Sequence, residues 1–277
     1  MIKYIATDLD GTLFYPKDKR HLISKENLFF LQSFIDGGGK VILVSGRSVE
    51  YGKKVEKVIG RKCTLIGFNG AVLYEDGKIL RSESIDKNEI KELIDELLVP
   101  FKLPGVMIMT EKGFFIKIRK GCEILKYFYA LYNKIQGNYG EVPHFKIEEF
   151  NEALENQKIF KLMFFIGVTS RKKKQAMDLN KVIRNAYTNI ESSWSNEVIE
   201  ITPKNCSKGS IMREYCKIKG IKDDEICVVG DSGNDISMFK EFKETSFVMG
   251  KAPEAVKKYA KYTIDKFEDL SRYIVKK

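Results

Sequence analysis

Short runs of hydrophobic, mostly β-branched residues alternate along the chain with longer segments in which hydrophobic positions recur every three or four residues. The first pattern is typical of buried strands and the second of amphipathic helices. At the start of the chain we expect a strand over residues 2–7, a helix over 25–35 and a second strand over 41–44. Strands that alternate with helices in this way predict an α/β protein.

The alternation continues through the next forty residues or so. Ser48 can cap the N-terminus of a further helix, because its side chain can accept a hydrogen bond from a free backbone N–H group. A strand is expected over 64–68, and residues 72–80 resemble a hairpin that turns at Asp76 and Gly77.

From about residue 85 the pattern changes, because strand patterns follow one another without a helix pattern between them. The helices expected in this part cover residues 87–98, 123–134 and 171–187, and the expected strands cover 106–110, 114–118, 158–166 and 198–201. Directly connected strands predict a mixed or antiparallel sheet.

The first pattern returns after Pro203. The elements expected there are helices over 210–219, 236–242, 253–259 and around Leu270, and strands over 226–229 and 246–249. The sequence therefore predicts an α/β fold with a Rossmann-like, doubly wound parallel-sheet core formed by residues 1–82 and 201–277. An α+β domain of residues 83–200 is inserted into this core.

The composition is that of a compact cytoplasmic protein. Of the 277 residues, 43% are hydrophobic, which is too many for a disordered chain. No apolar stretch approaches the ~20 residues of a membrane-spanning helix, so no membrane partner is expected. The sequence enters a strand pattern directly, without a signal peptide. The five cysteines are odd in number and far apart, which predicts reduced thiols.

The net charge of +10 raises the question of nucleic-acid binding. The basic residues are spread along the whole chain, and the one dense run, residues 171–174, has no interleaved aromatic residues. Such a run fits the exposed first turn of a helix better than a nucleic-acid surface. We therefore expect no nucleic-acid partner and interpret the charge as a general attraction for anionic substrates.

Acidic side chains follow two of the predicted core strands. The first strand leads directly into Asp8 and Asp10, and a strand near the end of the chain leads into Asp231, Asn234 and Asp235. Taken alone, the first segment also fits a strand followed by an Asx-type turn. However, the carboxyl ends of parallel strands meet at one edge of a sheet, and ligands bind there. Two acid clusters at such ends therefore indicate a site.

The second strand ends in Ser45, Gly46 and Arg47 before a helix begins, which suits the binding of an anion. Lys208 can neutralise a phosphate and a nucleophile, although by itself it also fits a solvated lysine in a first helical turn. Carboxylates without nearby His or Cys favour Mg²⁺, which binds one or two carboxylates together with a substrate phosphate. The pattern predicts a Mg²⁺ site for a phosphate ester.

These segments, in this order, resemble the motifs of the haloacid dehalogenase superfamily, and the position of the insertion resembles its Cof-like hydrolase branch with a C2B-type cap. Residues 8–12 (DLDGT) match the first motif, 45–47 (SGR) the second, Lys208 the third and 230–235 (GDSGND) the fourth. Residues 69–71 (NGA) match a further signature of the branch. In the core the resemblance rests on these motifs, and in the inserted domain on length and element order.

The resemblance implies a role for each matching residue. Asp8 would be the nucleophile and a metal ligand, Asp10 the general acid and base with its backbone carbonyl on the metal, and Asp231 the other carboxylate on Mg²⁺. Lys208 would be the third catalytic residue. The implied set for binding phosphate and substrate consists of Asp8, Ser45, Gly46, Arg47, Asn69, Lys208 and Asn234. Asn234 and Asp235 would support Asp231, metal-bound water or Lys208.

The implied activity is Mg²⁺-dependent hydrolysis of a small organic phosphate monoester, a sugar phosphate or a phosphorylated cofactor, through an aspartyl-phosphate on Asp8. Two alternatives stay open: a phosphomutase that acts on sugar phosphates, and a non-catalytic phosphometabolite-binding protein on the same scaffold. The sequence departs from the branch at Lys251, where asparagine is usual. Neither the physiological substrate nor the choice between a monomer and a homodimer follows from the sequence.

Overall fold

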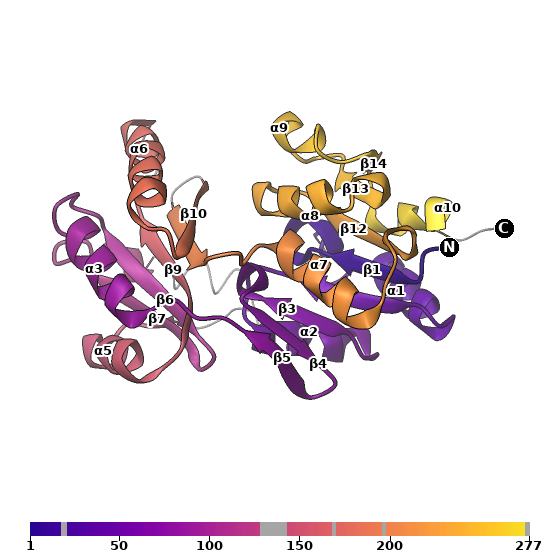
Figure 1. Cartoon of the computed structure of the whole chain (residues 1–277), viewed down its shortest axis with the longest axis horizontal. Coiled ribbons are helices and arrows are strands. Elements are labelled where there is room, and N and C mark those ends of the chain that lie inside the picture. Colours follow the sequence, from indigo (N-terminus) through magenta and orange to yellow (C-terminus); the bar gives the residue numbers. More distant parts are fainter. Residues whose placement is uncertain (18–20, 128–142, 168–169, 196–197, 275–277) are drawn as a thin grey trace. The chain divides into compact units, whose positions relative to one another are not determined.

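The computed structural model describes residues 1–17, 21–127, 143–167, 170–195 and 198–274. The chain divides into two compact units, which Figure 1 shows in ribbon form. The first contains Met1–Ser82 and Ser207–Lys277, and the second contains Glu83–Cys206. The second unit continues beyond residue 200, where the sequence pattern predicted its end. The reason is that its strand β11 pairs with the neighbouring strand β10 as far as Pro203.

The first unit is built on an eight-stranded sheet with the order β14-β13-β12-β1-β2-β3-β4-β5. The strands are β1 (Tyr4–Thr7), β2 (Lys40–Val44), β3 (Thr64–Gly67), β4 (Val72–Glu75), β5 (Lys78–Ser82), β12 (Ile226–Gly230), β13 (Ser246–Met249) and β14 (Tyr262–Ile264). From β14 to β3 all neighbours are parallel, and β4 and β5 are antiparallel. The predicted α/β class is thereby confirmed.

Helices cover this sheet and close its core. They are α1 (Lys25–Asp36), α2 (Val49–Ile59), α7 (Lys208–Lys219), α8 (Ile236–Glu241), α9 (Glu254–Lys257) and α10 (Ser271–Ile274). Residues 41–44 of β2 are buried without interruption, as expected where both faces of a parallel sheet are covered. Ala6 and Ile42 pack in one cluster with Ile211 and Met212 of α7. The predicted cap at Ser48 is present, because its side chain accepts the N–H of Tyr51.

The second unit contains a six-stranded sheet with the order β10-β11-β9-β6-β7-β8. Its elements are α3 (Lys87–Leu97), β6 (Gly105–Thr110), β7 (Gly113–Ile118), β8 (Pro143–His144), α5 (Ile147–Asn156), β9 (Ile159–Phe165), α6 (Ser170–Ala186), β10 (Ile190–Ser195) and β11 (Val198–Pro203). All pairings are antiparallel except that of β7 with β8. The prediction of a mixed or antiparallel sheet is confirmed. Most of the predicted helix 123–134 lies outside the described residues.

The core of the second unit lies between this sheet and its helices. Successive side chains of each strand point to opposite faces of the sheet. The cluster on one face contains Ile108, Leu162 and Phe164 of the strands, Leu93 of α3 and Phe150 of α5. The sequence pattern missed α5, β8 and β10. In β10 the residues are mostly polar, so this segment has no strong strand period. Helix α5 does have an amphipathic pattern, with Phe150, Ala153 and Leu154 on its buried face, and could have been predicted from it.

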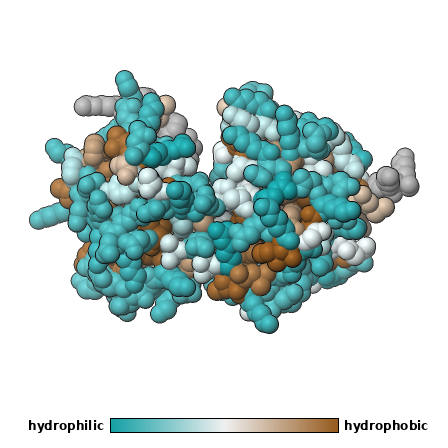
Figure 2. Space-filling view, in the orientation of Figure 1, coloured by the Kyte–Doolittle hydropathy of each residue, from teal (hydrophilic) through white to brown (hydrophobic). Residues whose placement is uncertain are grey.

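Among the described residues, no helix combines the length and the apolar character needed to cross a membrane. Figure 2 shows that hydrophilic residues cover most of the face in view, and hydrophobic residues reach the surface in limited patches. This agrees with the high charged fraction, 31% of the sequence.

Candidate active site

All the predicted site residues lie in the first unit. Asp8 and Asp231 are brought together by the neighbouring strands that precede them. Strands β1 and β12 are parallel, with Thr7 opposite Val229, so both strands end at the same edge of the sheet. The backbone N–H of Asp8 continues the pairing by donating to the carbonyl of Val229 over 3.0 Å. The two acid clusters of the sequence therefore meet, as the pattern predicted.

The turn that follows Asp8 needs a glycine for two reasons. Gly11 has a φ of +84°, in the left-handed region that side chains with a Cβ rarely adopt. A Cβ at this position would also lie 2.2 Å from Oδ2 of Asp231. The turn consequently packs directly against the second acid cluster, and the hydroxyl of Thr12 lies 3.4 Å from Oδ1 of Asp231.

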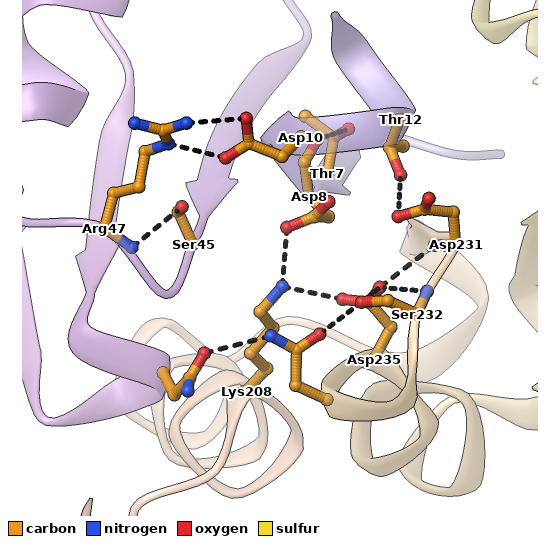
Figure 3. A network of polar contacts seen from close by, with 12 residues as sticks. Thr7, Asp8, Asp10, Thr12, Ser45, Arg47, Lys208, Asp231, Ser232 and Asp235 are labelled. Atoms are coloured by element: carbon orange, nitrogen blue, oxygen red, sulfur yellow. Dashed lines mark hydrogen bonds and ion pairs between the residues drawn. The ribbon is translucent and has the colours of Figure 1, made fainter. Parts of the chain in front are cut away.

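Lys208 connects the two clusters. It is the first residue of α7, and its Nζ lies 2.6 Å from Oδ1 of Asp8 and 2.7 Å from Oδ1 of Asp235 (Figure 3). Its exposed fraction is 1%, so the solvated lysine that the sequence also allowed is excluded. Burial alone would lower the pKa of Lys208, but Asp235 and Asp8 outweigh it and raise the pKa, so that the side chain is a cation.

The pKa of Asp8 is raised, because burial disfavours its charged form; Asp235 and Asp231 act in the same direction, while Lys208 opposes them. Burial also raises the pKa of Asp231 to about 6, with Asp235 adding to the effect and Lys251 and Lys208 reducing it. The site thus concentrates carboxylates beyond what one lysine neutralises. A divalent cation would correct this imbalance.

Asp235 holds the second cluster in shape. Its Oδ2 accepts the backbone N–H groups of Asp231 and Ser232 over 3.0 and 2.9 Å, and its Oδ1 faces Lys208. A Cβ on Gly230 would lie 2.4 Å from the carboxyl carbon of Asp235, so this close approach also requires glycine. Both oxygens of Asp235 are therefore already engaged by donors.

Carboxylate oxygens of Asp8, Asp231 and Asp235 lie within 4.8 Å of one another and form a group that could hold a metal ion. Hard oxygen donors of this kind suit Mg²⁺. Since Asp235 is engaged by backbone N–H groups and by Lys208, Asp8 and Asp231 are the members of this group that fit the role of ligand. The metal-ligand set expected from the sequence contained these two carboxylates.

Asp10 lies in the same turn and is held by Arg47. The Arg47 Nε and Nη2 lie 2.5 and 2.8 Å from the two Asp10 oxygens. The guanidinium stacks over the ring of Tyr51, 4.3 Å from its centroid, and the backbone N–H of Arg47 donates to the Ser45 hydroxyl over 3.1 Å. Gly46 lies between Ser45 and Arg47 in the bend after β2.

Asn69 lies between two of the predicted site segments. Its backbone N–H donates to the carbonyl of Ser45 over 3.0 Å, and its Oδ1 accepts from Nδ2 of Asn234 over 3.2 Å. Asn234 in turn accepts from the hydroxyl of Ser232 over 2.7 Å. The structure thus brings together every segment that the sequence analysis singled out for phosphate and metal.

Three residues of the site had no predicted role. Ser232 and Thr12 lie inside the recognised motifs, and their hydroxyl groups are a signal that sequence reasoning could have used. Tyr51 lies in the first turn of α2, and its ring supports the guanidinium of Arg47, which precedes the N-cap of that helix. Lys251, the departure from the branch pattern, lies over the ring of Tyr15, with 4.0 Å between Nζ and the centroid.

Comparison with known proteins agrees with this geometry. The sequence model of the haloacid dehalogenase-like hydrolase family matches residues 5–271. The chain belongs to this family. The family suspected from the motifs is thereby confirmed. The expected enzyme class, a phosphatase, is also confirmed, because curated relatives are named as phosphatases.

Two relatives come from Bacillus subtilis. The 5-amino-6-(5-phospho-D-ribitylamino)uracil phosphatase YwtE is 28% identical over 86% of this chain and 85% of its own length. The phosphatase YwpJ is 25% identical over 94% and 93% of the two chains. A solved structure of a haloacid dehalogenase-like hydrolase from B. subtilis superposes with a TM-score of 0.78 at 22% identity, over 99% of this chain and 100% of that one. This likeness shows the fold.

Proposed function

We propose that this haloacid dehalogenase-like hydrolase is a Mg²⁺-dependent phosphatase that hydrolyses a small organic phosphate monoester through an aspartyl-phosphate on Asp8. The observation that carries the proposal is the position of Asp8. Its carboxylate is almost fully buried at the end of β1, 2.6 Å from the cationic Lys208 and beside the carboxylate of Asp231. Lys208 favours the ionised form that a nucleophilic carboxylate needs and attracts an anionic substrate, and Asp231 offers a second carboxylate for a metal ion.

Asp8 and Asp231, with the backbone carbonyl of Asp10 as the family pattern implies, would hold Mg²⁺. When bound, Mg²⁺ supplies positive charge that offsets the repulsion between an anionic nucleophile and a phosphate. The fit rests on the hard oxygen donors of the group. It also rests on the raised pKa values of Asp8 and Asp231, which arise first from burial and then from the neighbouring carboxylates, so that a cation would favour their ionised forms. The role of Asp235 is to hold Lys208 and the backbone of Asp231.

The reaction of Asp8 forms one bond and breaks another. Oδ of Asp8 attacks phosphorus, the bond from phosphorus to the ester oxygen breaks, and the leaving alkoxide takes a proton from Asp10. In the second step Asp10 accepts a proton from water, which attacks the aspartyl-phosphate and releases inorganic phosphate. Asp8 is thereby regenerated. Lys208 offsets the charge of the nucleophile and of the phosphoryl group throughout.

The phosphoryl oxygens would be bound by Lys208, by the Ser45 hydroxyl and by groups of the loop from Ser45 to Arg47. This loop lies at the carboxyl end of β2 and precedes the N-terminus of helix α2, a position that favours an anion. Asn234 would complete the set from the other side of the site.

The second unit, Glu83–Cys206, would act as the cap that selects the substrate. It is joined to the first unit by two connections, as a hinged lid requires. The substrate class that we propose is a sugar phosphate or a phosphorylated cofactor. The named substrate of the relative YwtE, a phosphorylated ribitylaminouracil, belongs in the first set of compounds to assay.

The decisive experiment is release of inorganic phosphate from p-nitrophenyl phosphate with Mg²⁺ and with EDTA. We expect turnover only with Mg²⁺, and none in the Asp8→Asn variant under either condition. Asp36→Asn is the matched control, since Asp36 is a surface carboxylate paired with Arg61 away from the site residues. Equal release with EDTA, or release by Asp8→Asn at the wild-type rate, would contradict the proposal. A screen of phosphorylated metabolites, including pyridoxal phosphate and flavin mononucleotide, would then identify the substrate.

A further inference from the structure

The turn after β3, Phe68–Gly70, has an unusual backbone. Phe68 and Asn69 have φ values of +54° and +57°, and Gly70 has a φ of +109°. Residues with side chains rarely adopt this left-handed region, and two such residues in succession are rarer than one. A conformation of this kind persists only where the surrounding structure fixes it, and it is found preferentially at functional sites.

The turn holds the anion-binding loop through its backbone. The N–H of Phe68 donates to the carbonyl of Arg47 over 2.9 Å, and the N–H of Asn69 donates to the carbonyl of Ser45 over 3.0 Å. Two successive N–H groups of the turn are therefore directed to the same loop. The positions of Ser45 and Arg47 are thereby tied to the turn.

The same turn packs against the start of α7, where Lys208 lies. A Cβ on Gly70 would lie 2.6 Å from the backbone carbonyl of Ser207, the residue that caps this helix. The backbone of the turn therefore approaches the helix as closely as a glycine allows. Any change in the path of the turn would move it against the residue that precedes Lys208.

The side chain of Asn69 reaches the third segment. It is 7% exposed, and its Oδ1 accepts from Nδ2 of Asn234 over 3.2 Å. Asn234 accepts from the hydroxyl of Ser232, and the backbone N–H of Ser232 donates to Asp235, the carboxylate that also holds Lys208. Three segments that carry the proposed catalytic groups thus converge on one turn.

We propose that Asn69 is a positioning residue, which acts through Asn234 and through the backbone of Ser45 and does not bind the substrate. This inference rests on the proposed function, and it changes the role that the family resemblance implied, a contact with substrate. Asn69 suits the task because asparagine tolerates the left-handed backbone better than most residues and also offers an acceptor. Glycine would keep the backbone and lose the acceptor, which allows the two contributions to be separated.

The experiment compares Asn69→Gly, Asn69→Ala, Asn234→Ala and the double variant Asn69→Gly/Asn234→Ala with the wild type in p-nitrophenyl phosphate hydrolysis at saturating Mg²⁺. We expect Asn69→Gly to lower kcat about 10- to 100-fold with KM changed by less than about threefold, as for other groups that orient a site. Asn69→Ala should lose more, because it also disfavours the left-handed turn. The kcat of the double variant should be no more than about threefold below that of the worse single variant, because both substitutions remove the same interaction.

Asp76→Gly is the matched control, since Asp76 also has a positive φ, of +48°, but lies in the exposed turn between β4 and β5 and belongs to no proposed catalytic segment. Its kcat should equal that of the wild type. A raised KM with an unchanged kcat in Asn69→Gly would assign Asn69 to substrate binding and overturn the proposal. Multiplicative losses in the double variant, or an unchanged kcat in Asn69→Gly, would overturn it as well.

A second measurement decides the inference even if the wild type releases no phosphate, a result that would count against the proposed function alone. Amide hydrogen exchange should become faster in Asn69→Gly for the peptide that contains Ser232–Asp235, because Asn234 loses its acceptor. In Asn69→Ala exchange should also become faster for the peptide that contains Ser45–Arg47, because the left-handed turn whose N–H groups hold this loop is disfavoured. Unchanged exchange in both peptides, at an unchanged melting temperature, would show that the turn does not position them.

Discussion

Arg47 engages both carboxylate oxygens of Asp10, at 2.5 and 2.8 Å, and is itself stacked on the ring of Tyr51. The two partners differ in exposure, because the side chain of Arg47 is 17% exposed and that of Asp10 is 53% exposed. The arginine is the fixed member of the pair. It can set the direction from which the Asp10 carboxylate approaches the leaving group of a bound phosphate ester.

Asp10→Asn should lower kcat by ~10²- to 10⁴-fold, the usual contribution of general acid and base catalysis. The loss should be smallest for substrates with good leaving groups, because these need little protonation. The measurement is kcat for p-nitrophenyl phosphate and for an alkyl phosphate in the same preparation. Equal losses on both substrates would contradict the role of Asp10 as acid.

Arg47→Lys keeps the positive charge and loses the planar fork that holds both oxygens of Asp10. We expect kcat to fall about tenfold on an alkyl phosphate and less on p-nitrophenyl phosphate, because the misplaced group is the acid. Arg61→Lys is the matched control, since Arg61 holds the surface carboxylate of Asp36 in a similar two-bond arrangement. A loss that is equal on both substrates would assign Arg47 to phosphate binding instead.

The location of the site followed from the sequence because strand ends in a parallel sheet share an edge. The buried run before Asp8 and the one before Asp231 were recognisable, and their meeting is a consequence of topology. The partners within the site were harder to predict. Asp235 accepts backbone N–H groups, whereas Asp231 faces the turn of Gly11. This difference depends on the path of two tight turns, which hydrophobic periodicity does not describe.

The second unit was less predictable for a related reason. Helix α5 (Ile147–Asn156) buries only Phe150, Ala153 and Leu154, and β10 (Ile190–Ser195) is a polar edge strand at the end of its sheet. Strand β10 owes its formation to the neighbouring strand β11 more than to its own pattern. In α5 the spacing of the three buried residues is the amphipathic period of a helix and could have been recognised. Strand β14 (Tyr262–Ile264), at the edge of the first sheet, is too short for a period to be seen.

Asp8→Asn should abolish turnover and leave the fold intact, because the amide has the shape of the carboxylate but cannot attack phosphorus. In EDTA the variant should also be more stable than the wild type. Burial raises the pKa of Asp8, which means that its negative charge is unfavourable in the folded protein. The amide removes this charge from the buried group of carboxylates. Urea unfolding at pH 8 in EDTA measures the difference.

The control for this comparison is Asp36→Asn, which removes a surface charge and should not stabilise the protein. A variant that keeps a tenth of the wild-type rate would exclude Asp8 as nucleophile. A lower free energy of unfolding than that of the wild type in EDTA would show that the ion pair of Asp8 with Lys208 outweighs the crowding of carboxylates.

The raised pKa of Asp231, about 6, predicts how stability and metal affinity depend on pH. The ordinary value for this carboxyl group is 3.8, so between about pH 4 and pH 6 the folded protein retains a proton that the unfolded chain has released. The stabilisation by this proton is fully present below about pH 4 and is lost as the pH rises through about 6. Mg²⁺ must displace the proton, so its apparent affinity should increase with pH, by up to about tenfold per unit below pH 6.

The measurement is the free energy of unfolding in urea at several pH values between 5 and 8, in EDTA, for the wild type and for Asp231→Asn. Groups away from the site titrate equally in both proteins, so the difference between them reports on Asp231 together with its effect on the pKa of Asp8. The wild type should lose stability relative to the variant as the pH rises. Saturating Mg²⁺ should then stabilise the wild type more at pH 7.5 than at pH 5.5, since binding to the folded state alone adds RT ln(1 + [Mg²⁺]/Kd). A difference that is independent of pH, or a Mg²⁺ effect of equal size at both pH values, would exclude Asp231 as a carboxylate that exchanges a proton for the metal.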